Sequence, residues 1–220
     1  MNNTPLKILK NMFIASAGLF IFAVGCYLTI QANIGVAPWD SFNLGLSKTF
    51  GIKYGTASII VSVAVVLIDV ALKEKIGIGM LLDAFIVGKS VDLLNALDLV
   101  PKQTKLLPGL GLMAAGIVIM GFSQFLYMKV GLGCGPRDTL FVGIKRKLPK
   151  IPVGIINTAI LALVTLCGWL LGGPIGIGTL ICAFCIGPVM QLDFKIVKFK
   201  PETVTHQGII ESLKVIFKSR

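Results

Sequence analysis

Two aspartates, Asp40 and Asp138, stand in matching sequence contexts and are the first candidates for chemistry in this chain. Each lies two residues after a proline, in the segments NIGVAPWDSFNLGLSK (33–48) and GLGCGPRDTLFVGIKR (131–146), and Asp138 follows Asp40 by 98 positions. A carboxylate in such a segment could bind a cation or a proton, and an ionisable residue inside a membrane domain is a functional candidate. The pair therefore predicts one shared substrate site, which requires a fold that brings the two segments together.

Four neighbouring residues complete the candidate site at the two segments. Trp39 and Arg137 precede the aspartates; an aromatic ring could stack on a substrate, and a guanidinium could bind a carboxylate or a phosphate. Gly35 and Gly133 allow backbone angles that other residues avoid, so they predict a break in the chain before each proline.

A structural role is the competing interpretation of the two aspartates. Proline is well suited to the first position of a helix, which would place Asp40 and Asp138 in the first turn of two short helices. A carboxylate there can accept hydrogen bonds from free backbone N–H groups and favours the positive end of the helix. The two roles can coexist, and the sequence leaves both open.

Asp83 is a further candidate because it lies within an apolar segment, 76–95. Its counterpart in the second half of the chain is Cys182, so this charge is peculiar to the first half. The sole histidine, His206, lies in the C-terminal tail, and no Ser/His/Asp, Cys/His or metal-binding set is evident. We therefore expect no enzymatic activity, no metal site and no cofactor.

Composition places these residues in a membrane protein. Hydrophobic residues make up 55 % of the chain and charged residues only 14 %, and the mean hydropathy is +0.88. Soluble domains usually carry about a quarter charged residues, and a membrane-spanning helix needs about 20 mostly apolar residues. Six stretches meet this requirement: about 11–32, 54–72, 76–95, 108–129, 152–171 and 174–193.

The chain also repeats itself outside the two aspartate segments. IGIGMLLDAFIVG (76–88) matches IGIGTLICAFCIG (175–187) with one extra residue in the spacing. We expect a single membrane domain over 1–220, with one repeat over about 10–98 and a second over about 108–195. Three spans per repeat is an odd number, so the second repeat would be inverted relative to the first, an arrangement common in transporters. The predicted fold is all-α and polytopic, with short helices at the two Pro-x-Asp breaks.

The distribution of positive charge gives the expected orientation. With the N-terminus inside, the outer loops hold only Lys48, Lys53, Lys102 and Lys105, and the other loop and tail cations fall on the inner side. Both termini would then be cytoplasmic. The net charge of +11 follows from these loops and tails, so it does not indicate nucleic-acid binding. The tail over 196–220 has an amphipathic pattern from about 206, which would meet anionic headgroups; a partly ordered tail is the alternative.

The motifs resemble those of a known family. NIGVAPWDSFNLGLS, followed by GIKYGTAS and GIGMLLDAFIVG, is similar to the YczE/YyaS/YitT family of bacterial integral membrane proteins, over most of residues 10–195. The residues that carry the resemblance are Gly35, Pro38, Trp39, Asp40, Gly45, Gly51 and Gly77-Ile78-Gly79. The second repeat departs from the pattern at Arg137. The resemblance implies a bacterial plasma-membrane protein and supplies no substrate.

These observations predict a small-molecule or ion transporter with a central site between the two breaks. The alternative is a non-transporting accessory or regulatory membrane protein. The expected partners are the lipid bilayer and a substrate that the sequence does not name, and homo-oligomer formation stays open. The two functions differ in one structural respect: a carrier needs a cavity lined by polar residues, whereas an accessory protein would be packed shut at the same depth.

Overall fold

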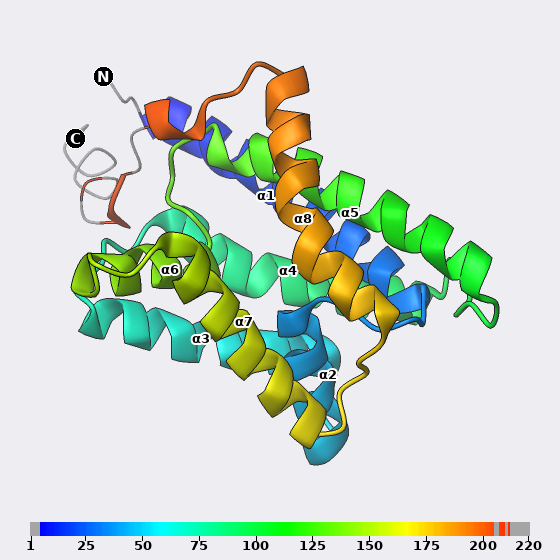
Figure 1. Ribbon diagram of the computed structural model, residues 1–220. Coiled ribbons are helices and arrows are strands. Elements are labelled where there is room, and N and C mark those ends of the chain that lie inside the picture. The colour runs from blue at the N-terminus through cyan, green and yellow to red at the C-terminus, as the bar shows by residue number, and fades with distance from the viewer. Residues whose placement is uncertain (1–4, 205–206, 210, 212–220) are drawn as a thin grey trace.

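The computed structural model describes residues 5–204, 207–209 and 211, and all regular secondary structure in this part of the chain is helical (Figure 1). The long helices are α1 (Pro5–Gln31), α3 (Tyr54–Ala71), α4 (Ile78–Leu97), α5 (Leu106–Met128), α7 (Val153–Leu170) and α8 (Ile177–Ile196). The shorter elements are α2 (Pro38–Phe50), α6 (Pro136–Lys147) and the 3-10 turn η1 (Pro201–Thr203). The predicted all-α class is confirmed, and α2 and α6 begin at the prolines of the two Pro-x-Asp motifs.

Five of the long helices are long and apolar enough to cross a membrane: α1, α3, α5, α7 and α8. α4 has a similar length but carries Asp83, Lys89 and Asp92, so a sixth span stays a prediction. Large apolar side chains cover the outside of the bundle; Leu163 and Trp169 of α7 are each 61 % exposed. Such surfaces suit contact with lipid and would be a liability in water.

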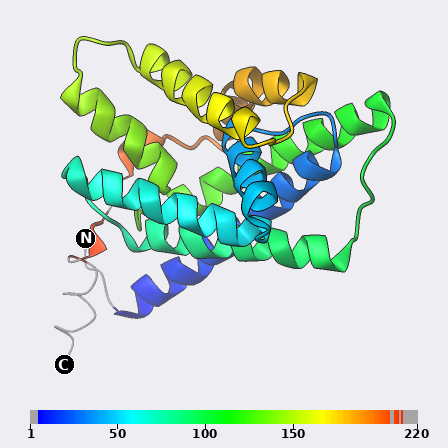
Figure 2. The ribbon, with the colours of Figure 1, turned by 90° about the horizontal axis from the view of Figure 1, so that it is seen from below.

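The helices pack around a centre formed by α1 and α5, which lie against each other. α4 packs on α1, α8 packs on α5, and the short helices α2 and α6 each contact both α3 and α7. In Figures 1 and 2 the start of α1, the α3–α4 turn and the α6–α7 loop lie at one end of the bundle, at the left, and the α4–α5 loop lies at the other. The long helices therefore run alternately between the two ends.

Helix boundaries follow the internal repeat of the sequence. α3 begins at Tyr54 and α7 at Val153, 99 positions later, and both are 18 residues long. α4 begins at Ile78 and α8 at Ile177, again 99 positions later, and both are 20 residues long. Residues in these helices can therefore be compared pairwise between the two halves.

The break in each half is hydrogen-bonded to the start of the last helix of the other half. The Gly178 N–H donates to the Ile34 carbonyl at 2.8 Å, and the Gly79 N–H donates to the Leu132 carbonyl at 2.8 Å. Ile34 and Leu132 are equivalent in the repeat, as are Gly79 and Gly178. Each bond is therefore the counterpart of the other, with the two halves exchanged. Both bonds satisfy backbone groups of the breaks that would otherwise be costly to bury.

Glycine is required where each break meets that helix. Gly35 has φ +100° and Gly133 has φ +114°, values in the region that side chains other than glycine rarely adopt. A Cβ on Gly35 would lie 2.5 Å from the Gly176 nitrogen, and one on Gly133 would lie 2.9 Å from the Gly77 Cα. The candidate residues Gly35 and Gly133 therefore bring the breaks into close contact with α8 and α4.

The two halves differ in how their last two helices pack. α3 and α4 touch through glycines, since a Cβ on Gly88 would lie 2.7 Å from the Gly55 carbonyl oxygen. The equivalent residues of α7 and α8 are Gly154 and Gly187, and a Cβ on either would meet nothing within 4 Å. α3 and α4 are thus closed on each other, whereas α7 and α8 stand apart at the corresponding place.

Candidate functional site

A cavity of about 890 Å³ lies where α7 and α8 stand apart. Five of the seven residues proposed from sequence line it: Trp39, Asp40, Gly133, Arg137 and Asp138. The fold therefore brings the two Pro-x-Asp motifs to one cavity. Gly35 and Asp83 do not line it; Gly35 contacts the start of α8, and Asp83 faces a second, smaller cavity.

The two aspartates interact with tyrosine hydroxyls. Tyr54 Oη donates to Asp40 Oδ1 at 2.8 Å, and Tyr127 Oη donates to Asp138 Oδ2 at 3.3 Å. Asp40 is only 2 % exposed, whereas Asp138 is half-buried. The hydrogen bond that fixes Asp40 thus comes from the start of α3 and not from a free N–H of its own helix, which departs from the capping interpretation.

The two residues that break the match between the motifs contact each other. The guanidinium carbon of Arg137 lies 5.1 Å from the centre of the Trp39 ring, a cation–π arrangement that joins α6 to α2. Sequence reasoning gave these side chains separate roles toward a substrate. In the structure they form one unit on the cavity wall.

The wall of the large cavity is otherwise mostly apolar, with a few polar groups. Gln124, Thr139 and Asn157 are its uncharged polar side chains near the motifs, and the apolar part includes Phe22, Met120, Leu161, Ile186 and Met190. Cavities of this size and character are typical of small-molecule sites, where a few polar groups orient a ligand within an apolar enclosure.

The cavity extends to the end of the bundle that carries the start of α1. Its lining there includes Glu74, Lys75, Arg146 and Gln207. Arg146 Nη2 and Glu74 Oε2 form an ion pair at 3.1 Å, which joins α6 to the α3–α4 turn. The mouth of the cavity is therefore more polar than its wall.

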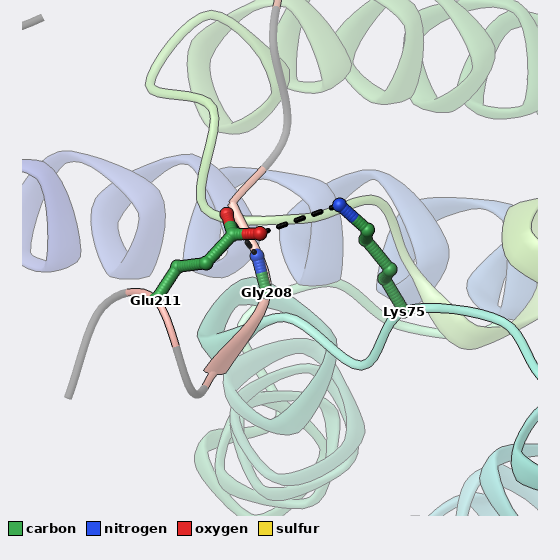
Figure 3. Close-up of polar contacts among 3 residues, drawn as sticks. All are labelled: Lys75, Gly208 and Glu211. Atoms are coloured by element: carbon green, nitrogen blue, oxygen red, sulfur yellow. Dashed lines mark hydrogen bonds and ion pairs between the residues drawn. The ribbon is translucent and has the colours of Figure 1, made fainter. Parts of the chain in front are cut away.

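The start of the C-terminal tail lies against the same end. The Gln207 N–H donates to the Gly131 carbonyl at 2.9 Å, and Figure 3 shows Glu211 contacting Lys75, with Nζ and Oε1 3.3 Å apart, and the Gly208 N–H. The amphipathic helix predicted from about 206 falls mostly on residues outside the described ranges. The described part of the tail is thus tied to the cavity mouth.

A second cavity, of about 60 Å³, is lined by residues of α1, α3, α4, α5 and α6. Its lining consists of Phe22, Ser58, Ser62, Asp83, Val87, Gln124, Tyr127, Gly135, Arg137 and Asp138. Arg137 and Asp138 line both cavities, so the two spaces meet at the second Pro-x-Asp motif.

Sequence reasoning missed Ser58, Ser62 and Tyr127, which line the small cavity, and Tyr54, whose hydroxyl bonds to Asp40. The two serines carry a usable signal, because they are four positions apart in an apolar span and so share one helix face. The tyrosines carry none, since their bonds to Asp40 and Asp138 depend on how α3 and α5 are placed beside the short helices.

Comparison with known proteins places this arrangement in a family. The model of a family of unknown function, DUF6198, matches residues 9–194, which covers the two breaks and the helices around both cavities. The chain belongs to this family. No solved structure matches the chain.

Curated relatives support the same membership. An uncharacterized protein of Haemophilus influenzae is 30 % identical over 87 % of each chain. The uncharacterized membrane protein YczE of Bacillus subtilis is 32 % identical over 80 % of this chain and 82 % of its own length, and YyaS of the same organism is 32 % identical over 79 % and 86 %. The resemblance to YczE and YyaS is confirmed, and together with the apolar helices it makes this chain an integral membrane protein.

Proposed function

We propose that this protein is a carrier of the bacterial plasma membrane that moves a small molecule or an ion by alternating access. Its substrate site would lie between the two Pro-x-Asp breaks. The observation that carries the proposal is the cavity of about 890 Å³ that reaches Asp40 and Asp138 from one end of the bundle. An accessory protein would be packed shut at the depth of the breaks, whereas a cavity lies here, with Asp40, Arg137 and Asp138 among the few polar groups of a mostly apolar wall.

The two cavities have equivalent linings, which supports alternation between two states. Nine of the residues around the small cavity have their repeat counterparts around the large one: Phe22 with Met120, Ser58 with Asn157, Ser62 with Leu161, Asp83 with Cys182, Val87 with Ile186, Gln124 with Cys26, Gly135 with Ala37, Arg137 with Trp39 and Asp138 with Asp40. The small cavity is therefore the counterpart of the large one in a collapsed form. Exchanging the conformations of the halves would open the small cavity and close the large one.

The glycine contacts supply the parts that would move. The Gly55–Gly88 contact closes α3 on α4, and Gly154 and Gly187 would make the same contact if α7 closed on α8. Pro188 lies inside α8 directly after Gly187, and a proline within a helix removes one backbone hydrogen bond and allows bending. α8 is thus suited to the larger change of position.

The orientation of the proposed carrier follows from the distribution of charge. With both termini in the cytoplasm, the large cavity of this structure opens inward and the α3–α4 contact closes the outer side. We propose transport and not catalysis as the role of the paired aspartates, and the protein would act with the bilayer and its substrate as its partners.

Cysteine labelling tests the proposal without knowledge of the substrate. In a variant whose five native cysteines are replaced, Leu161→Cys probes the large cavity and Ser62→Cys probes its counterpart. A membrane-impermeant thiol reagent should reach position 161 from the cytoplasmic face and position 62 from the outer face, because each is exposed in one of two states. Lys147→Cys, at the end of α6, should react only from the cytoplasmic face. A position 62 that never reacts from outside, beside a reactive position 161, would contradict the carrier function.

A further inference from the structure

The small cavity is lined mainly by oxygen-bearing side chains. Ser58 and Ser62 come from α3, Asp83 from α4, Tyr127 from α5 and Asp138 from α6. Its volume of about 60 Å³ has room for a few water-sized groups, far less than an organic solute needs. Any ligand held there is therefore small.

The two serine hydroxyls point to such a ligand. Ser58 is 3 % exposed and Ser62 is 5 % exposed, and neither makes a hydrogen bond within the described part of the chain. Serines in apolar helices usually bond to a carbonyl of their own helix, as Ser16 does to Met12 at 2.8 Å and Ser123 to Met120 at 2.7 Å. Both hydroxyls face the small cavity, so their hydrogen-bond partner must come from its contents, and water or a ligand there would satisfy both.

Two carboxylates converge on the same cavity. Asp83 Oδ2 lies 2.8 Å, and Asp138 Oδ2 3.6 Å, from the position that a Cβ on Gly135 would occupy. A side chain at position 135 would therefore fill the space between them. Glycine at this position leaves the two carboxylates facing a common space.

The charge around the cavity favours a single positive charge. The charged and titratable groups that line it are Asp83, Tyr127, Arg137 and Asp138. With both carboxylates ionised and Arg137 positive, one negative charge is left over. Within the described chain no ion pair within 4 Å joins Arg137 to either carboxylate, and its guanidinium stacks on Trp39 instead.

From these observations we infer that the small cavity binds one monovalent cation, sodium or a proton, through Asp83, Asp138 and the hydroxyls of Ser58 and Ser62. Oxygen ligands suit hard cations, and the absence of sulfur and imidazole from the lining disfavours transition metals. One surplus charge, and no described group of three acidic, histidine or cysteine side chains that could hold a metal, disfavour a divalent ion.

The position of this site gives the cation a role in the proposed carrier. In the large cavity the counterparts of Asp83 and Ser62 are Cys182 and Leu161, so the cation site exists in one half only. A cation that bridges α3, α4 and α6 would stabilise the state in which the outer side is closed, because opening that side would separate its ligands. This coupling role rests on the proposed function, whereas binding of the cation does not.

Thermal unfolding of the purified full-length protein in detergent tests the inference. Sodium chloride should raise the unfolding temperature of the wild-type chain in a saturable manner, relative to choline chloride at the same ionic strength. Asp83→Asn should abolish the rise, and Ser58→Ala with Ser62→Ala should weaken it while both carboxylates remain. Asp98→Asn, at the exposed end of α4, should keep the wild-type response.

The remaining outcomes decide between the two cations and against the inference. A wild-type protein that ignores sodium but gains stability on acidification, with the gain lost in Asp83→Asn, identifies a proton held at Asp83. A response to sodium that survives in Asp83→Asn, or a wild-type protein indifferent to both cations, would overturn the inference. Size-exclusion chromatography shows whether each variant is folded, and because no step needs transport, failure here is distinct from failure of the labelling test.

Discussion

Asp40 and Asp138 are equivalent in sequence but differ in their surroundings. Asp40 is 2 % exposed and accepts a 2.8 Å hydrogen bond from Tyr54, whereas the half-buried Asp138 accepts a longer bond, 3.3 Å, from Tyr127. Both carboxylates line the large cavity, but water can replace a lost partner more easily at the more exposed Asp138 than at Asp40. The two aspartates should therefore respond differently to loss of their tyrosine partners.

The hydroxyl of Tyr54 should matter more for stability than that of Tyr127. Tyr54→Phe leaves the buried Asp40 carboxylate without its donor, and an unsatisfied buried acceptor costs about 1–3 kcal/mol. Tyr127→Phe should cost about 1 kcal/mol or less, because Asp138 is more exposed and the hydrogen bond that it loses is longer, 3.3 Å. Thermal unfolding in detergent measures both. Equal losses in the two variants would contradict the assigned difference in burial.

At the scale of residues, the sequence identified side chains that line one cavity but did not predict their contacts with one another. The repeated Pro-x-Asp pattern identified Asp40, Asp138, Trp39 and Arg137, since repeated polar residues in an apolar chain are hard to explain otherwise. The contact of Arg137 with Trp39 could not be predicted, because it depends on how α2 and α6 approach each other. The position of Asp83 in a separate cavity is a consequence of helix packing in the same way.

Glycines determine how closely the helices pack, and equivalent glycines have different surroundings in the two halves. Gly55 and Gly88 are in tight contact, whereas Gly154 and Gly187 face open space. A Gly-to-Ala change in a packed contact costs overpacking strain of about 1–3 kcal/mol, whereas a change at an open surface position is usually within about 0.5 kcal/mol. The same substitution should therefore separate the closed pair of helices from the open pair.

Gly55→Ala should destabilise the protein and Gly154→Ala should not. The added methyl group at position 55 would clash with the Gly88 carbonyl and the Asp92 carboxylate, while at position 154 it would meet nothing within 4 Å. The unfolding temperature of each purified variant is the readout, with the wild-type chain as reference. A loss of stability for Gly154→Ala as large as that for Gly55→Ala would mean that α7 and α8 are packed like α3 and α4.

At the scale of the whole molecule, the sequence predicted the repeat and the membrane class, and the all-α fold is confirmed. The order of six spans and their inverted arrangement stay predictions, because the charged residues of α4 make its sequence less typical of a membrane-spanning helix. Which half is open could not be predicted, because both carry the same glycine pair. In the proposed carrier the open and the closed pair of helices would exchange between two states, so the residues alone do not determine which pair is open.

Closure of α7 on α8 is the central claim, and a disulfide trap tests it most directly. In a cysteine-free chain, Gly154→Cys with Gly187→Cys places two thiols at the positions equivalent to the Gly55–Gly88 contact, and a protease site in the 171–176 loop reports a crosslink between the two helices. Mild oxidation in membranes should join the fragments, because a carrier must visit the closed arrangement, and Gly154→Cys with Leu180→Cys should stay uncrosslinked. Fragments that never join, although both thiols react with maleimide, would contradict alternating access in this protein.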